Sequence, residues 1–384
     1  GSGNCKTKGF ICPFHGWRWN MEGVNTFVYG KKVFSEDVLD QAEIDLVPCR
    51  VELWGGCAFI NFDHEAPSLL ECLGPVADRL TGRHVEELKM EWWYGTVLPT
   101  NWKLAMEAFM EGYHTMRTHP QLNIIPNSSP YGNDLDPNAV ASAPQTQTAR
   151  QYVDITIKFV ETLSEGMAGM IHPSEVEIAR SLRDIELPDD VQEAAGAFYG
   201  RLMHEITARG RAKGLNMPDL IALAGKPFNA VEFMFPHYFL LPFFGAMSSY
   251  RIRPLTEETC LFEIWSLAIL PEDETREPVK MVMLPHDSPD FPPIPRQDYD
   301  NLPLQQQGLH AGGFDYLRLS QQYEGMISNH ERLIDGYLAG LDPQKLAAAS
   351  RIVNSGFDSP ILDIGFGPGP RAPEPVAERL DAAA

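Results

Sequence analysis

The stretch "NWKLAMEAFMEGYHTMRTHPQ", residues 101–121, mixes apolar side chains with carboxylates and histidines at spacings that predict a helix. On a regular helix Glu111 and His114 share a face, whereas His114 and His119 point about 140° apart. Pro120 disfavours the α conformation of the residue before it. We therefore expect His119 to lie at or just past the helix end, where it can turn back towards His114.

Two imidazoles brought together in this way suit Fe(II), Zn or Cu, and an added carboxylate with open positions favours non-haem Fe(II). The alternative is that His114 and His119 are ordinary surface or core residues near a helix end. Their spacing differs from the H-E-x-x-H pattern of zinc peptidases. A second pattern, Cys12-Pro-Phe-His15 followed by Gly-Trp, predicts one half of a Rieske-type ligand set, in which two Cys and two His hold a [2Fe–2S] cluster.

The composition is that of a globular enzyme, with 384 residues, 44% hydrophobic and 22% charged. The formal charge of −21 argues against a nucleic-acid partner, because phosphate binding needs clustered Lys and Arg. No apolar run approaches the roughly 18 residues of a membrane span, and no export signal is visible. Six cysteines are too few for a disulfide scaffold. We expect a cytoplasmic protein that binds neither membrane nor nucleic acid.

The first part of the chain reads as short strands and turns, with a hairpin at 49–63 around Gly55-Gly56. The stretch 229–270 is aromatic and β-branched and predicts buried antiparallel strands, with a turn at "PLTEET". Before the sheet, we expect a helix followed by a connector (66–92) and a loop (122–150). A helical stretch then runs to residue 225, starting at about residue 151 or, by the clearest helical pattern, at about residue 174. After the sheet, we expect a Pro- and Asp-rich loop (285–300) and a helical region (314–350). These segments predict an α+β fold.

The motifs taken together resemble the large (α) subunit of Rieske non-haem iron ring-hydroxylating oxygenases. The residues that carry the resemblance are Cys12, His15, Asn101-Trp102-Lys103, Glu107, Tyr113, His114 and His119. The resemblance implies that residues 1–64 are the C-terminal part of a small all-β Rieske [2Fe–2S] domain. Residues 65–362 would be a catalytic domain with a central antiparallel sheet surrounded by helices (helix-grip, START-like), and 363–384 a Pro/Gly/Ala-rich tail.

The resemblance also assigns the iron ligands. It implies that His114, His119 and Asp298 bind the mononuclear Fe(II). Asp298 is chosen because the family carries an Asp some eight residues before a Gln-x-Gly-Leu like that at 306–309. Spacing alone left three other candidates open, namely Asp287, Asp290 and Asp300.

Cys12 and His15 are the implied cluster ligands. The Cys-x-His half of the family's pattern is absent from the sequence, and we expect it upstream; we interpret Cys5 as structural. Glu111 stands where the family has a bridging Asp, and Ala108 where it has an Asn. The resemblance makes Glu111 an electron-transfer bridge between His114 and His15 of an adjacent subunit.

The implied activity is oxygenation with O2 and with electrons that pass from NAD(P)H through a reductase, and often a ferredoxin, to an α3 trimer with or without β subunits. The expected substrate is apolar, aromatic or polycyclic, and would be hydroxylated, dihydroxylated or oxidatively demethylated. Its pocket is expected beside six aromatic residues: Phe233, Phe235, Tyr238, Phe239, Phe243 and Phe244. Two alternatives are a truncated or degenerate α-subunit-like protein that binds metal and ligand without turnover, and a zinc hydrolase.

Overall fold

A computed structural model of the chain describes residues 9–125, 148–271, 277–313, 316–320, 323–354, 356 and 360–362. Cys5 and the expected tail at 363–384 lie outside these ranges. The chain divides into two compact units, Gly1–Ala66 and Pro67–Ala384.

The first unit is built from short strands. An antiparallel sheet of order β1-β2-β3 joins Phe10–Ile11, Arg18–Trp19 and Asn25–Phe27, and a short helix α1 follows at Gln41–Ile44. The expected hairpin is present as β4 (Arg50–Trp54) and β5 (Cys57–Asn61). Gly55 and Gly56, at φ of 56° and 74°, form its turn, because two consecutive positive φ values fit the twist of a two-residue hairpin.

The second unit centres on a six-stranded sheet of order β11-β6-β10-β9-β8-β7. Every pairing is antiparallel except that of β11 with β6. The strands are β6 (Lys89–Leu98), β7 (Glu232–Met234), β8 (Tyr238–Pro242), β9 (Ala246–Pro254), β10 (Cys260–Ala268) and β11 (Val282–Met283). The predicted strands at 229–270 and the turn between β9 and β10 are confirmed, and so is the α+β fold class.

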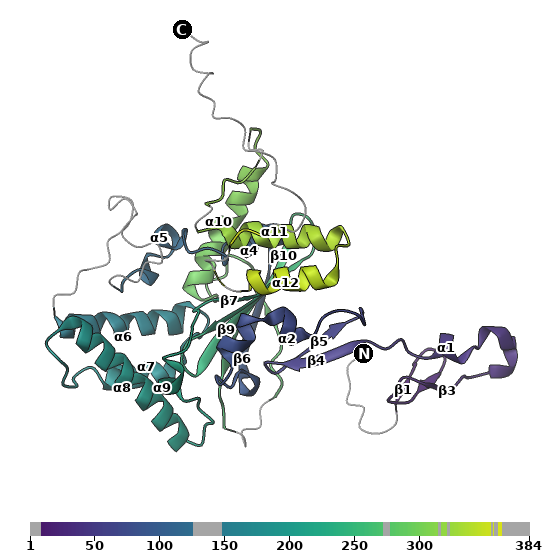
Figure 1. Ribbon diagram of the computed structural model, residues 1–384, viewed down its shortest axis with the longest axis horizontal. Coiled ribbons are helices and arrows are strands. Elements are labelled where there is room, and N and C mark those ends of the chain that lie inside the picture. The colour runs from purple at the N-terminus through teal and green to yellow at the C-terminus, as the bar shows by residue number, and fades with distance from the viewer. Residues whose placement is uncertain are drawn as a thin grey trace, which may run out of the picture. The chain divides into compact units, whose positions relative to one another are not determined.

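Helices surround this sheet in groups (Figure 1). The helices are α2 (Leu69–Leu73), α3 (Pro75–Leu80), α4 (Trp102–Glu107), α5 (Thr115–Thr118), α6 (Ala149–Gly166), α7 (Pro173–Ser181), α8 (Val191–Ala212), α9 (Leu220–Leu223), α10 (Pro293–Leu309), α11 (Gly325–Leu338) and α12 (Pro343–Val353). In Figure 1, α6–α9 gather on one side of the sheet, and α4 lies with α10 and α11 on another.

Three expectations about these elements are wrong. Residues 101–121 do not form one helix, because the chain leaves α4 after Glu107 and resumes as α5 only at Thr115. Residues 285–300 are not all loop, because α10 begins at Pro293. The connector expected up to Trp92 ends earlier, at Leu88, because β6 begins at Lys89 and pairs along its length with β10.

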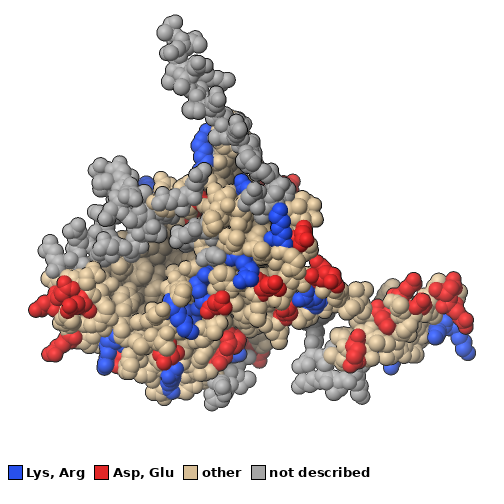
Figure 2. All heavy atoms as spheres, in the orientation of Figure 1, with Lys and Arg blue, Asp and Glu red and all other residues tan. Residues whose placement is uncertain are grey.

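The core of the second unit lies between the sheet and the helices, where Phe239, Tyr250 and Phe262 are fully buried. Figure 2 shows basic and acidic side chains interspersed over the visible face. Within the described ranges, no helix is both long and apolar enough to cross a membrane.

Candidate metal centre

The break between α4 and α5 sets the position of the two histidines. His114 is the N-cap of α5 and His119 is its C-cap, so the helix between them has little more than one turn. His119 adopts φ −123° and ψ 61°, outside the α region, immediately before Pro120. The prediction that His119 lies at the helix end is confirmed. The two ring centroids are 5.1 Å apart.

Asp298 reaches the same place from α10, far along the sequence. Prolines occupy the first turn of this helix, where a missing N–H costs no intrahelical bond. Ile294, Asp298 and Leu302 recur every four residues on its buried face. Asp298 is only 4% exposed, whereas the rival candidates Asp287, Asp290 and Asp300 are exposed.

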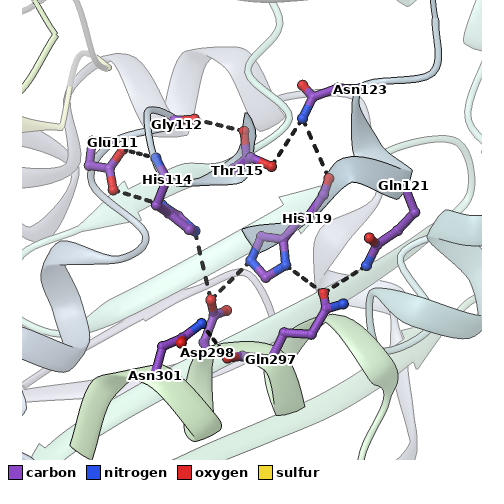
Figure 3. Close-up of polar contacts among 10 residues, drawn as sticks. All are labelled: Glu111, Gly112, His114, Thr115, His119, Gln121, Asn123, Gln297, Asp298 and Asn301. Atoms are coloured by element: carbon purple, nitrogen blue, oxygen red, sulfur yellow. Dashed lines mark hydrogen bonds and ion pairs between the residues drawn. The ribbon is translucent and has the colours of Figure 1, made fainter. Parts of the chain in front are cut away.

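These three side chains converge on one point (Figure 3). Asp298 Oδ1 lies 2.9 Å from Nε2 of His119 and 3.7 Å from Nε2 of His114. The potential ligand atoms all lie within 4.8 Å of one another, and they are the one group of three or more such ligands found within the described ranges. Two imidazoles and one carboxylate are the donor set of a non-haem Fe(II) site, so the residues fit that metal.

The remaining ring nitrogen of each histidine is held by an outer partner (Figure 3). Glu111 Oε1 lies 2.6 Å from Nδ1 of His114, and its Oε2 accepts a hydrogen bond from the His114 backbone N–H at 3.0 Å. Gln297 Oε1 lies 2.7 Å from Nδ1 of His119. Such contacts select the tautomer that presents Nε2 to a metal. No sequence pattern pointed to Gln297.

The contacts of His114 also change its protonation equilibrium. Burial alone would lower the pKa of its imidazole, but the hydrogen bond and charge of Glu111, together with the charge of Asp298, outweigh burial and raise it. Glu111 thus pairs with His114 through a short turn within one chain.

A cavity of about 420 Å³ opens beside the site and is lined by two of its ligands, His114 and Asp298. Its apolar lining is Leu104, Ala108, Leu302, Leu309, Leu317, Leu319 and Ile327. Its ionisable lining is Glu107, Glu111, His114, Asp298, Arg318 and Glu324. The cavity therefore combines an aliphatic wall with more carboxylates than cations.

The expected aromatic wall is wrong for this cavity. None of the six aromatic residues predicted from 233–244 is among its lining residues. Phe233, Phe239 and Phe244 are instead buried in the hydrophobic core, where Phe239 packs against Phe109 and Phe233. The pattern at 229–270 correctly indicated a buried sheet, but burial of a strand does not indicate which of its faces meets a cavity.

The N-W-K motif joins α4 to α10 near the site. The side chain of Asn101 caps α4 by accepting the N–H of Lys103 at 2.9 Å, and its backbone N–H donates to Gln306 Oε1 at 2.8 Å. Gln306 is buried and belongs to the Gln-x-Gly-Leu pattern. Two separate sequence motifs thus meet here and hold together the helices that carry Glu107 and Asp298.

Cys12 and His15 lie in the first unit, in the turn after β1. Backbone N–H groups of His15 and Phe14 donate to the Cys12 sulfur and lower the pKa of its thiol, which favours the thiolate needed for ligation. Within the described ranges no further ligand completes a group of three with this pair. The turn fits one half of a cluster site.

Comparison with known proteins gives a family match. The family described as ring hydroxylating alpha subunit (catalytic domain) matches residues 78–340. A carnitine monooxygenase oxygenase subunit of Acinetobacter baumannii is 31% identical over 122 residues, which are 31% of this chain and 32% of that protein.

Two further curated proteins show the range of similar sequences. A chloroplastic choline monooxygenase of Spinacia oleracea is 29% identical over 30% of this chain and 28% of its own length. The large oxygenase component of a naphthalene 1,2-dioxygenase system of Pseudomonas fluorescens is 32% identical over 29% of this chain and 26% of its own length. The matched part thus spans only about a third of each curated relative, or less.

Among solved structures, the quaternary ammonium Rieske monooxygenase CntA in complex with gamma-butyrobetaine has a TM-score of 0.45 and 16% sequence identity. That match covers 85% of this chain and 70% of the other.

Proposed function

Because the chain belongs to the ring hydroxylating alpha subunit family, we propose that it is the oxygenase component of a Rieske non-haem iron system. Proteins of this family use a mononuclear iron and a Rieske cluster. The observation that carries the proposal is the convergence of His114, His119 and Asp298 beside a cavity.

The roles of the site residues follow from their contacts. His114 and His119 would hold Fe(II) through Nε2, and Asp298 through its carboxylate. The iron would supply activation of O2 at its open positions. Glu111 and Gln297 orient the two imidazoles, and the aliphatic side chains of Leu302 and Leu309 form part of the apolar wall of the cavity.

The electron supply is proposed from the same family. Residues 1–64 would belong to the Rieske domain and 65–362 to the catalytic domain, with Cys12 and His15 as cluster ligands. Glu111 would bridge His114 to His15 of a neighbouring subunit in a trimer. NAD(P)H would deliver electrons through a reductase or ferredoxin. The proposed location is cytoplasmic, because six cysteines in 384 residues are too few for a disulfide scaffold.

For the substrate we propose a small molecule with a cationic ammonium group and an aliphatic body. Carboxylates outnumber the single Arg318 in the cavity lining, and the apolar lining is aliphatic. Similar proteins are named as monooxygenases of carnitine, choline and glycine betaine. Other similar proteins are named for chlorobenzene and naphthalene, so the aromatic substrate expected from the sequence is the competing candidate.

Substrate-dependent oxygen uptake tests this proposal. The full chain is loaded anaerobically with Fe(II), supplied with ascorbate as electron donor, and exposed to O2 with choline, carnitine or naphthalene. We expect uptake and an oxidised product with an ammonium compound. Protein loaded with Zn(II) is the control and should be inactive, because zinc has no redox chemistry.

Two results would contradict the proposal. Hydrolytic activity of the zinc-loaded chain would favour the zinc hydrolase. Tight iron binding with no oxidised product from any compound, even with a reductase and ferredoxin added, would favour the protein that binds without turnover. Oxygen uptake with naphthalene but with neither ammonium compound would support the proposed oxygenase activity and show that the substrate is aromatic.

A further inference from the structure

Glu107 occupies a position between two cavities. It is the last residue of α4 and lines the cavity beside the metal ligands. It also lines a second cavity of about 630 Å³, which shares Leu104, Leu309 and Ile327 with the first. Glu107 therefore contributes to the walls of both cavities.

Among the described residues, Glu107 is also the one carboxyl of the metal-side cavity whose side chain has no hydrogen-bond or ion-pair partner of any kind. Glu111 is engaged by His114, and Asp298 by His119. Glu324 accepts the backbone N–H of Ser320 at 2.6 Å. The carboxyl group of Glu107 makes neither a hydrogen bond nor an ion pair with a residue of the described ranges, so it is available to a ligand.

The surroundings of Glu107 oppose its ionisation. Burial and then the nearby charge of Glu331 raise the pKa of Glu107 to about 8, against the opposing effect of Lys103. Lys103 is itself held in an ion pair by Glu331. The charged and titratable groups that face Glu107 or line the two cavities with it are Lys103 on α4, Glu111 and His114 before α5, Asp298 and His310 on and after α10, Arg318 and Glu324 before α11, Glu331, Arg332 and Asp335 on α11, and Glu257 and Glu258 in the β9–β10 turn.

We propose that Glu107 determines specificity by binding the cationic part of the substrate, and that it releases a proton when it does so. This inference rests on the proposed class of ammonium substrate. Without ligand the carboxyl group is mostly neutral near pH 7. When an ammonium group enters, the O–H bond of the carboxyl group breaks, its proton passes to solvent, and the carboxylate balances the charge of the ligand.

The inference separates cationic from neutral ligands of the same shape. A cation should displace close to one proton at pH 7, and none well above pH 8, where Glu107 is already ionised. Below pH 8 the apparent affinity for the cation should fall about tenfold for each unit by which the pH is lowered. A neutral ligand should displace no proton, and its affinity should not follow this dependence.

Calorimetry on the full chain loaded with Fe(II) under anaerobic conditions tests this. Choline is titrated at pH 7 in two buffers of different ionisation enthalpy, which gives the number of protons released. The neutral isostere 3,3-dimethylbutan-1-ol is the matched control ligand. We expect proton release with choline and none with the alcohol.

Two variants sharpen the experiment. Glu107→Gln should weaken choline binding about 10- to 100-fold and abolish its proton release, while binding of the alcohol stays unchanged. Glu331→Gln removes the charge that opposes ionisation of Glu107, so it should reduce proton release at pH 7 while choline still binds. Circular dichroism confirms that both variants are folded.

The inference would be overturned if Glu107→Gln bound choline with unchanged affinity and released as many protons as the native chain. Choline binding to the native chain without proton release would also overturn it. The test also separates this inference from the proposed function. Proton-coupled choline binding without oxygen uptake would retain the role of Glu107 and refute the oxygenase. Oxygen uptake with naphthalene, together with no choline binding, would retain the oxygenase and refute the role of Glu107.

Discussion

Gln297 fixes the ring of His119, because its side-chain oxygen faces Nδ1 and leaves Nε2 directed at Asp298. The same oxygen accepts a hydrogen bond from Gln121 Nε2 at 2.7 Å. Outer partners of this kind commonly change metal affinity although they do not touch the metal.

Replacement of Gln297 by Leu is predicted to weaken Fe(II) binding about 10- to 100-fold, because the imidazole loses the acceptor that selects its tautomer. Competition with a chromogenic chelator measures this affinity. Gln121→Leu is the matched control, since it removes a donor to Gln297 but leaves the acceptor of His119 in place. Equal losses in the two variants would show that Gln297 acts only through general packing.

Glu107 should also make folding stability depend on pH. Its pKa is about 8 in the folded chain and near 4.5 when unfolded, so the folded state binds more protons between these values. Stability should therefore fall as pH rises from about 4.5 to 8. Relative to the native chain, Glu107→Gln is predicted to gain about 3–4 kcal/mol of stability between pH 5 and pH 8. Urea unfolding at both pH values measures this, and a constant difference would contradict it.

Sequence patterns predicted the position of the two histidines, but not the residues Asp298 and Gln297 that contact them. Pro120 correctly indicated that His119 ends a helix, because the restriction it imposes is local. Asp298 needed the family resemblance, since the sequence does not show that Asp287 and Asp290 precede α10, or that Asp300 lies on its exposed face. Gln297 was missed because its contact with His119 joins residues that are 178 positions apart.

At the level of elements, the site depends on how α10 packs against the sheet. Tyr299, the neighbour of Asp298, is fully buried, and its ring centroid lies 5.0 Å from that of Phe262 on β10. Phe262 also contacts Phe109, which lies in the segment between α4 and α5. One aromatic side chain thus supports both segments that carry metal ligands.

Phe262→Ala is predicted to cost about 3–5 kcal/mol of folding stability and also to weaken Fe(II) binding, because both ligand-bearing segments lose a packing partner. Phe198→Ala is the control. Phe198 is equally buried, but on α8, so its loss should cost similar stability and leave iron affinity unchanged. Chemical unfolding and chelator competition on both variants make the comparison. Iron affinities reduced equally in both would refute the link between β10 and the site.

The elements that sequence patterns missed have identifiable causes. The prolines at 293 and 295 suggested a loop, yet they lie in the first turn of α10, where proline is compatible with a helix. The apolar spacing at 101–121 suggested one helix, but burial of Phe109 and Met110 continues through the break between α4 and α5, so periodicity did not mark it. The start of β6 lacked a clear alternation, and its pairing with β10 is decided by distant residues.

For the whole molecule, the two units contribute different parts of the proposed chemistry. The unit Gly1–Ala66 carries the Cys12 and His15 pair, and the unit Pro67–Ala384 carries the three ligands and the cavity. The β-rich start and the central sheet could be predicted from strand patterns alone. The position of the cavity could not, because it depends on α4, α10 and α11 meeting along one side.

The iron content of the full chain tests the central claim most directly. After anaerobic loading with Fe(II) and removal of unbound metal, we predict about one mononuclear iron per chain, bound at the three-ligand site found in the described part of the chain. Asp298→Ala should lose this iron, and Asp300→Ala, an exposed aspartate on the same helix, should keep it. Iron retained in Asp298→Ala, or lost equally from both variants, would contradict the assignment of His114, His119 and Asp298.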